Sequence, residues 1–114
     1  MQISKEISEL SAKAKAGKIA LEDMKGATIT VTNIGSVGGT YATPIINHPE
    51  VAILGVYKIQ DLPVWDGKQF IPAKKQNYTI TCDHRLIDGA VAARFMKSFA
   101  GRLENPSRLL IEMV

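Results

Sequence analysis

Histidine is the side chain best suited to proton transfer near neutral pH, and this chain of 114 residues has two. His84 lies in the segment Cys82–Gly89, where a predicted strand gives way to a predicted helix. Side chains at such a junction lie at the end of a sheet, where functional sites often occur. Asp88, four residues further on, carries a charge that can tune the imidazole. Asp88 could also be simply the N-cap of the helix that follows, a role that is compatible with one in the site. The segment predicts a general base at His84, with a purely structural histidine as the alternative.

The same side chains allow other chemistry, which the spacing does not favour. Cys82 and His84 are two residues apart and would share one face of a strand, as a thiol nucleophile and its base must. Cys82 is also in phase with apolar neighbours, which is typical of a buried small hydrophobe. A metal site would need His84, Asp88 and His48 to converge, and the sequence has no H-E-x-x-H motif or paired cysteines. His48 is expected to be an ordinary loop histidine.

The composition is that of one globular domain. Apolar residues make up 46% of the chain and charged residues 22%, which allows a core and argues against disorder. No apolar run approaches the ~20 residues of a membrane span, and the first residues do not resemble a secretory signal. One cysteine fits a reducing compartment, and a net charge of +3 without a basic cluster does not indicate a nucleic-acid partner. We therefore expect a cytoplasmic protein, or a mitochondrial matrix protein in a eukaryote, that binds neither nucleic acid nor membrane.

Residue periodicity predicts the elements that must position His84. Apolar residues three and four apart predict an amphipathic helix over residues 3–16, ended by Gly17. Strict alternation then predicts a half-buried strand over residues 27–32. The glycine-rich run at 35–39 is expected to be a flexible loop that permits a tight turn or a close approach. It lacks the Lys-Ser or Lys-Thr of a phosphate-binding loop.

The second half of the chain predicts two more strands and a helix. A continuous apolar run at 50–59 predicts a central strand covered on both faces. The Asp-Gly pair at 66–67 predicts a hairpin turn, and alternation at 76–82 predicts a third strand. Helical spacing returns over 91–103 and is ended by an Asn-Pro pair. The order of elements predicts an α/β (α+β) fold, in which helices cover a mixed or antiparallel sheet.

Several segments together resemble one known family. Asp83–Gly89 reads D-H-R-L-I-D-G and resembles the D-H-R-x-x-D-G signature of the dihydrolipoamide acyltransferase components of 2-oxoacid dehydrogenase complexes. Other segments resemble that family in the same order, namely Thr32–Gly35, Gly38–Thr40, Pro44–Asn47, Pro49–Val56 and Leu103–Leu110. The resemblance extends over essentially the whole chain.

The resemblance implies a fold and a set of roles. The fold would be the two-layer sandwich of chloramphenicol acetyltransferase, working as a trimer with active sites between subunits. Coenzyme A, a substrate, and a lipoyl group carried by a separate domain would enter a channel from opposite ends, with no metal. By resemblance His84 is the general base. Thr32 stands where many members have a serine that stabilises the oxyanion, and Asp88 orders the site through an ion pair with a basic residue.

The family's catalytic domain is about twice as long as this chain, which resembles only its C-terminal half. Residues 1–114 are therefore expected to be a partial catalytic domain without lipoyl or subunit-binding domains, and apolar surface is expected to be exposed. The N-terminal half would supply channel wall, coenzyme A contacts and the basic partner of Asp88. The tail residues Leu109, Leu110, Ile111 and Met113 resemble an element that joins trimers into 24-mer or 60-mer cores, with packing on their own subunit as the alternative.

The expected function is transfer of an acyl group between dihydrolipoamide and coenzyme A within a 2-oxoacid dehydrogenase complex. Residues 33–36 and 104–106 are more similar to acetyl and branched-chain members than to succinyl members. The expected partners are the lipoyl domain and the 2-oxoacid decarboxylase and dihydrolipoamide dehydrogenase components. The alternative is a catalytically silent, truncated module that retains only the assembly contacts.

Overall fold

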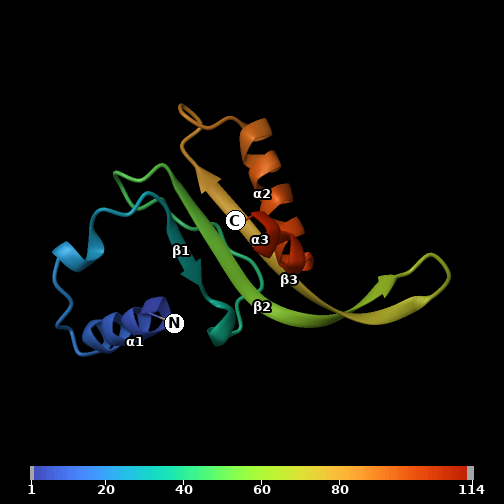
Figure 1. Cartoon of the computed structure of the whole chain (residues 1–114), viewed down its shortest axis with the longest axis horizontal. Helices are drawn as coiled ribbons and strands as arrows, with labels where there is room; N and C mark the ends of the chain where they lie inside the picture. The colour runs from blue at the N-terminus through green and yellow to red at the C-terminus, as the bar shows by residue number, and fades with distance from the viewer. Residues whose placement is uncertain (1, 113–114) are drawn as a thin grey trace.

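The computed structural model describes residues 2–112 and is organised around a three-stranded mixed sheet (Figure 1). The strands are β1 (Thr30–Asn33), β2 (Ala52–Trp65) and β3 (Phe70–Cys82), in the order β1-β2-β3. β1 runs parallel to β2, and β2 runs antiparallel to β3. With the helices described below, this confirms the predicted α/β fold and selects a mixed sheet over a purely antiparallel one.

Residues 2–112 include three α-helices, of which one packs against β3 and another packs against that helix. They are α1 (Gln2–Lys15), α2 (Gly89–Glu104) and α3 (Pro106–Glu112), with short 3-10 turns η1 (Glu22–Met24) and η2 (Gly35–Val37) between them. α2 packs on β3 and α3 folds back against α2. Figure 1 shows α1 apart from the sheet, and its apolar residues Ile3 and Ile7 are exposed. None of the helices within residues 2–112 is long and apolar enough to cross a membrane.

The two faces of the sheet have different covers. The register aligns Thr32, Gly55 and Thr79 in one row across the three strands, so these residues share a face. The opposite face carries Leu54 and Ile80, which are also paired. This second face lies against α2, and an apolar cavity of about 150 Å³ between them is lined by Ile29, Ala52, Ile80, Ile87, Val91, Ala92 and Phe95. Thr32 therefore faces away from α2.

The fully buried core is small and lies in the first half of β2. Its apolar members are Ala52, Ile53, Leu54 and Tyr57. The prediction of a central strand over 50–59 is confirmed, but burial on both faces ends at Tyr57, because Lys58 and Ile59 are exposed. A register irregularity between Val56 and Ile59 marks this point, as bulges often do where a strand changes its surroundings.

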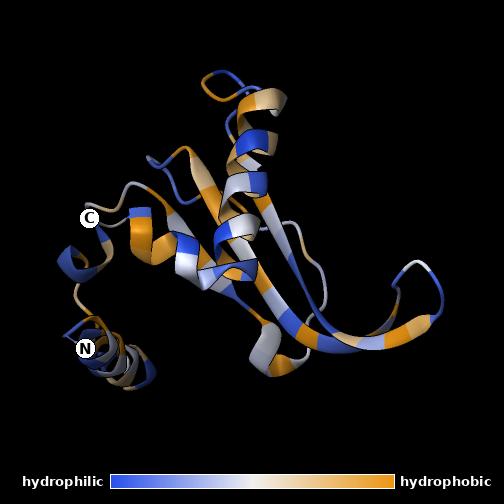
Figure 2. Ribbon diagram, turned by 45° about the vertical axis from the view of Figure 1, so that its right-hand side comes forward, coloured by the Kyte–Doolittle hydropathy of each residue, from blue (hydrophilic) through white to orange (hydrophobic). Residues whose placement is uncertain are grey.

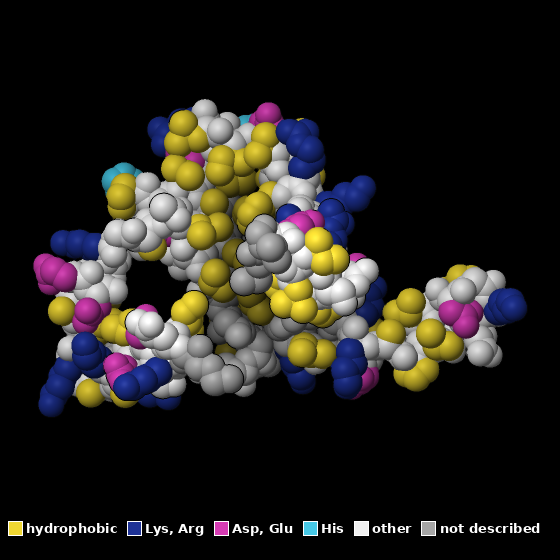
Figure 3. All heavy atoms as spheres, viewed as in Figure 1, with side chains coloured by type: hydrophobic (Ala, Val, Ile, Leu, Met, Phe, Trp, Pro, Cys, Tyr) yellow, Lys and Arg dark blue, Asp and Glu magenta, His cyan; other side chains and the backbone are white. Residues whose placement is uncertain are grey.

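Beyond that irregularity the two long strands continue as a ribbon, residues 59–75, which we call the arm. Figure 3 shows the arm projecting from the rest of the molecule, and Figure 2 shows apolar residues continuing along it. The predicted hairpin turn is present, with Gly67 at φ +104 and the Asp66 carboxylate accepting bonds from Lys68 N–H and Gln69 N–H (2.8 and 2.9 Å). At the base of this turn, Trp65 and Phe70 meet edge to face at 5.3 Å.

The structure corrects the bounds of two predicted strands and defines the form of two other segments. The strand expected over 27–32 spans only Thr30–Asn33, and the one expected over 76–82 begins earlier, at Phe70. The apolar tail is helical as α3, although Met113 lies outside the described residues. The glycine-rich run holds the ordered turn η2, where a Cβ on Gly35 would be 2.8 Å from the Tyr57 carbonyl carbon. The close approach expected of these glycines is therefore confirmed, and the loop predicted here includes a 3-10 turn.

Candidate functional site

The turn after β3 carries His84, and main-chain hydrogen bonds fix both ends of this turn. Asp83 N–H donates to the carbonyl oxygen of Val51 (2.8 Å), which ties the turn to the start of β2. Leu86 N–H and Ile87 N–H both donate to the carbonyl oxygen of Asp83 at 3.0 Å. His84 itself is exposed to solvent. A substrate can therefore reach its imidazole, as a general base requires.

The two charged neighbours of His84 pair with each other. The Arg85 guanidinium donates from Nε to Asp83 Oδ1 (2.9 Å) and from Nη2 to Asp83 Oδ2 (2.6 Å), and Arg85 N–H donates to Oδ1 (3.0 Å). The side-chain bonds to Arg85, followed by the bond from its N–H, lower the pKa of Asp83 to about 2. The same pairing raises the pKa of Arg85. Both groups thus keep their charge at neutral pH.

Asp88 begins helix α2. Its Oδ1 accepts a hydrogen bond from Val91 N–H (2.8 Å), and its backbone is extended (φ −77, ψ 164), the arrangement of a helix N-cap. Among residues 2–112 no cation forms an ion pair with Asp88. The capping role predicted as compatible with a site role is confirmed, and the expected ion pair stays a prediction.

Thr32 lies far from His84 within one chain. Thr32 is half-buried and aligned with Thr79, and β3 continues three residues beyond Thr79 before it ends at Cys82. Three residues along a strand and two strand spacings across the sheet separate Thr32 from Cys82 by about 14 Å. His84 lies beyond Cys82. A single copy therefore does not bring the Thr32 hydroxyl and the His84 imidazole within hydrogen-bonding reach.

The loop that follows Thr32 is held onto the sheet by polar contacts. Asn33 Oδ1 accepts from Gly35 N–H (2.9 Å), and Lys58 N–H donates to the carbonyl oxygen of Gly39 (2.8 Å). Further along, the Tyr57 hydroxyl donates to the carbonyl oxygen of Ala42 (2.7 Å). These contacts fix the backbone on the Thr32 face of the sheet.

Tyr57 is a structural residue that the sequence analysis did not single out. Its side chain is 1% exposed, and its hydroxyl also lies 2.5 Å from Thr79 Oγ1. The space it uses lies above Gly55, where an added Cβ would be 2.6 Å from Thr79 Oγ1. A tyrosine inside an otherwise aliphatic run was the available signal, because a buried phenol needs a hydrogen-bond partner.

The alternative chemistries gain no support from the structure. β3 ends at Cys82, so His84 is not on the strand and the two do not share a strand face. His48 is exposed in a loop, where it borders a cavity of about 460 Å³ together with Leu21 and Met24. No group of three or more His, Cys, Asp or Glu side chains within residues 2–112 could hold a metal ion, so His48, His84 and Asp88 do not converge.

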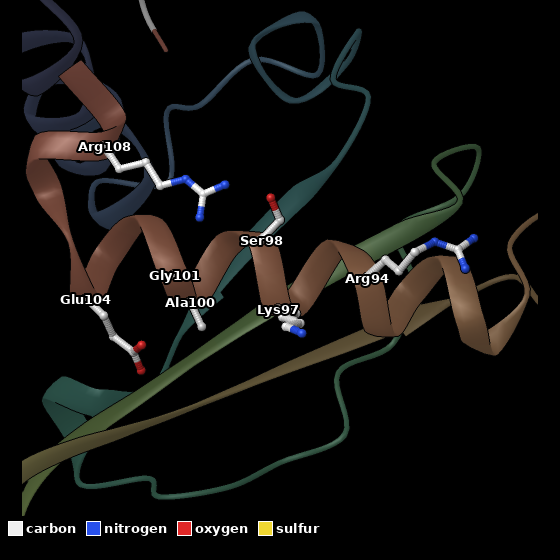
Figure 4. Close-up of a pocket in the computed structure, with 7 residues that line it drawn as sticks. All are labelled: Arg94, Lys97, Ser98, Ala100, Gly101, Glu104 and Arg108. Atoms are coloured by element: carbon white, nitrogen blue, oxygen red, sulfur yellow. The ribbon is translucent and has the colours of Figure 1, made fainter. Parts of the chain in front are cut away.

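Another concave surface lies between α2 and α3. This groove of about 470 Å³ includes Arg94 and Lys97 on α2 and Arg108 on α3 (Figure 4). Arg108 is already paired with Glu112 at 2.9 Å, and Glu104 is also at the groove. The groove contains none of the predicted site residues.

Comparison with known proteins places this geometry in a family context. The model of the family described as 2-oxoacid dehydrogenases acyltransferase (catalytic domain) matches residues 1–111. Dihydrolipoyllysine-residue acetyltransferase components of pyruvate dehydrogenase complexes are similar to this chain, at 48% identity in Cupriavidus necator and 47% in Staphylococcus aureus. Each alignment covers 97% of this chain but only 20% and 26%, respectively, of the relative.

Solved structures show the same likeness and the same difference in length. The chain superimposes on the dihydrolipoamide acetyltransferase of Azotobacter vinelandii with a TM-score of 0.89 and 46% identity, covering 96% of this chain and 45% of that one. That structure was used to study a serine, a histidine and an asparagine in the catalytic mechanism. The cubic core of a pyruvate dehydrogenase multienzyme complex also matches with a TM-score of 0.89, at 45% identity over 96% of this chain and 45% of that one. The chain thus spans less than half of these catalytic structures, and it belongs to the 2-oxoacid dehydrogenase acyltransferase (catalytic domain) family.

Proposed function

We propose that residues 1–114 form the C-terminal half of an acyltransferase catalytic domain, which transfers an acyl group between dihydrolipoamide and coenzyme A. One observation carries the assignment of roles. In the Azotobacter vinelandii enzyme the studied serine precedes the histidine by 52 residues, and the asparagine follows the histidine by four. The same spacings separate Thr32, His84 and Asp88. A hydroxyl, an imidazole and a short polar side chain thus recur at matching positions.

In this proposal His84 is the base. A thiol has a pKa of about 8.5 and is mostly protonated at neutral pH, so attack requires a group that removes its proton. His84 takes the proton from coenzyme A, and the thiolate forms a bond to the thioester carbonyl carbon of acyl-dihydrolipoamide. The tetrahedral intermediate collapses by breaking the carbon–sulfur bond to dihydrolipoamide. The departing sulfur then takes the proton back from His84.

Thr32 supplies a hydroxyl donor to the oxyanion of that intermediate. A threonine retains the hydroxyl of a serine and adds a methyl group. Loss of one oxyanion donor typically lowers kcat by about 10²–10³-fold, so removal of the Thr32 hydroxyl is expected to lower kcat by a factor in this range. Asp88 fixes the start of α2 next to the His84 turn, and asparagine at the matching position of the relative caps helices equally well. Its second carboxylate oxygen is available for the expected basic partner.

The proposed site is shared between copies of the chain. Thr32 and the end of β3 are about 14 Å apart in one copy, so the base and the oxyanion donor that serve one thioester must come from different subunits. This supports the homotrimer, and the exposed apolar residues Leu110 and Ile111 of α3 support further assembly into a core. A similar protein forms a cubic core. The lipoyl domain, the 2-oxoacid decarboxylase and the dihydrolipoamide dehydrogenase are the proposed partners in a cytoplasmic complex.

The proposed acyl group is acetyl, because the similar proteins in two bacterial species are acetyltransferases. The first experiment measures transfer from acetyl-coenzyme A, and in parallel from isobutyryl-coenzyme A, to dihydrolipoamide. The chain is compared with His84→Ala. Turnover with acetyl-coenzyme A that the substitution abolishes supports the proposal. A folded chain with no turnover above the variant contradicts it.

Complementation tests whether the site is shared. Thr32→Ala is expected to lose about 10²–10³-fold of the activity and His84→Ala nearly all of it, whereas subunits of the two variants, mixed and reassembled, regain part of the wild-type rate. A mixed assembly contains interfaces with both intact side chains only if these come from different copies. Failure to regain any activity, with mixed assembly verified by mass spectrometry, would contradict a shared site.

The second candidate function is a silent assembly module. The observation that favours it is the exposure of large apolar side chains from Ile3 to Ile111, which indicates that another chain covers much of this surface. In that case the folded chain would associate with itself or with a longer acyltransferase but would not turn over. The activity assay above distinguishes the two functions.

A further inference from the structure

The turn that carries His84 is organised by the residue before it. Asp83 uses its N–H to bind the Val51 carbonyl, its carbonyl to accept from Leu86 and Ile87, and its carboxylate to accept from Arg85 N–H. These bonds reach the chain both before and after His84. They connect the start of β2 with three of the residues that follow the histidine.

The Arg85 side chain closes this arrangement into a ring. Its guanidinium donates hydrogen bonds to both oxygens of the Asp83 carboxylate. The two side chains that flank His84 in the sequence are therefore bonded to each other, and the ring that they form includes the backbone of His84. Such two-pronged contacts are stronger and better defined in geometry than single ones. The low pKa of Asp83 keeps the acceptor charged throughout the neutral range.

We infer that Asp83 is a positioning residue for His84: its carboxylate, clamped by Arg85, fixes the turn from which the imidazole reaches the substrate thiol. This inference rests on the proposed role of His84 as the base. His84 is exposed within one copy, so no packing inside that copy fixes its place, and the turn is what positions it there. A base has to stand within about 2.6–3.2 Å of the proton it removes. A misplacement of about 1 Å can lower a rate 10²-fold.

The hairpin tip of the arm provides a matched control. The Asp66 carboxylate accepts backbone bonds from Lys68 N–H and Gln69 N–H, as the Asp83 carboxylate accepts one from Arg85 N–H, so both side chains stabilise a turn. It lies at the far end of the β2–β3 ribbon from His84. If Asp83 only forms a turn, its removal should resemble removal of Asp66.

The experiment compares Asp83→Ala, Asp83→Asn and Asp66→Ala in the assembled full chain. Asp83→Ala is expected to lower kcat at least about tenfold, with KM for coenzyme A changed less than about twofold, because geometry and not binding is lost. Asp83→Asn retains an oxygen that accepts Arg85 N–H but loses the two-pronged contact with the Arg85 guanidinium, so it is expected to restore kcat only in part. Asp66→Ala should leave kcat unchanged. Equal kcat values for Asp83→Ala and Asp66→Ala, or an Asn variant as slow as the Ala variant, would overturn the inference.

A second measurement separates this inference from the proposed function. Hydrogen exchange of the Arg85 amide is expected to accelerate at least about tenfold in Asp83→Ala, because that N–H loses its acceptor. The Lys68 amide should respond only to Asp66→Ala. An unchanged Arg85 amide overturns the positioning role even if the enzyme is active. Accelerated exchange in a chain that has no wild-type turnover retains the anchored turn and contradicts the proposed function instead.

Discussion

The β2–β3 ribbon has two halves with the same pairing and different surroundings. In residues 52–57 and 78–82 the ribbon lies between α2 and the loop that follows Thr32, and its centre is buried. In the arm, other elements border only the base, where Lys74 and Lys75 line a pocket with residues of α2, and Ile59, Trp65 and Phe70 are more than half exposed. Pairing of strands is therefore not what excludes water. The layers on each side of the sheet do so.

The contrast also explains where the proposed site lies. Thr32 and the His84 turn belong to the covered half, whose geometry is fixed by the Tyr57 hydroxyl and the Asp83 bonds. An uncovered two-stranded ribbon is only marginally stable in water. The arm therefore offers no precise frame for catalysis, and its apolar side chains are available for contact with another chain.

The largest expected difference between the two halves comes from removing one large side chain in each. Tyr57→Ala removes a fully buried ring and its hydroxyl contacts and is expected to cost about 3–5 kcal/mol. Trp65→Ala removes a half-exposed ring whose partner is Phe70 and is expected to cost about 1 kcal/mol. Urea unfolding followed by circular dichroism measures both. Similar losses would show that the arm is as well packed as the covered half.

A smaller effect is expected from adding a single methyl group. Gly55→Ala places a Cβ 2.6 Å from Thr79 Oγ1 and also against the Tyr57 hydroxyl, so the buried ring must move. Overpacking of this kind costs about 1–3 kcal/mol. Ala73→Val in the arm adds volume on a half-buried strand position with open surroundings and should cost less than about 0.5 kcal/mol. Denaturant midpoints of the two variants, taken with equal m-values, test the ranking.

The smallest expected effect is the response to acid. Folding lowers the pKa of Asp83 to about 2 from an ordinary value of 3.8, so its contribution to stability is present above pH 4 and is lost as pH falls toward 2. Backbone bonds from Gln69 and Lys68 lower the pKa of Asp66 in the same direction. Thermal unfolding between pH 5 and pH 2 should therefore depend less on pH in Asp83→Asn and in Asp66→Asn than in the wild type. We expect the larger change for Asp83, and the reverse order would contradict the clamp by Arg85.

Local signals predicted the elements that local interactions determine. Gly17, with φ +66, ends α1 as its sequence pattern indicated, and Asp88 caps α2. The Asp-Gly turn closes the hairpin. In each case the conformational preference of the residue itself determines the local structure, so a single sequence is enough to predict that structure.

Strand bounds and site geometry that depend on pairing with a distant segment of the chain could not be predicted in this way. The first half of β3 contains two adjacent lysines, Lys74 and Lys75, which interrupt the alternation of apolar and polar residues. They are nevertheless part of the strand, because both pair with β2. Residues 27–29 alternate well and yet have no partner, because pairing of β1 with β2 begins at Thr30 and Ile53. The separation of Thr32 from the His84 turn is likewise a property of the register, which no motif encodes. The resemblance indicated the site residues but could not place them in one chain.

The parallel pairing of β1 with β2 also has a consequence for the order of folding. The β2–β3 hairpin closes across residues 66–69, whereas β1 reaches β2 only after the chain has looped through residues 34–51. Loop closure costs about 0.6 kcal/mol for each doubling of length, so this second closure is slower by roughly tenfold or less. Hydrogen-exchange labelling during refolding should protect the amides of β3 before those of β1. The strand that carries the Thr32 hydroxyl would then join a hairpin that is already formed, and the oxyanion donor would be the last part of the proposed site to reach its place.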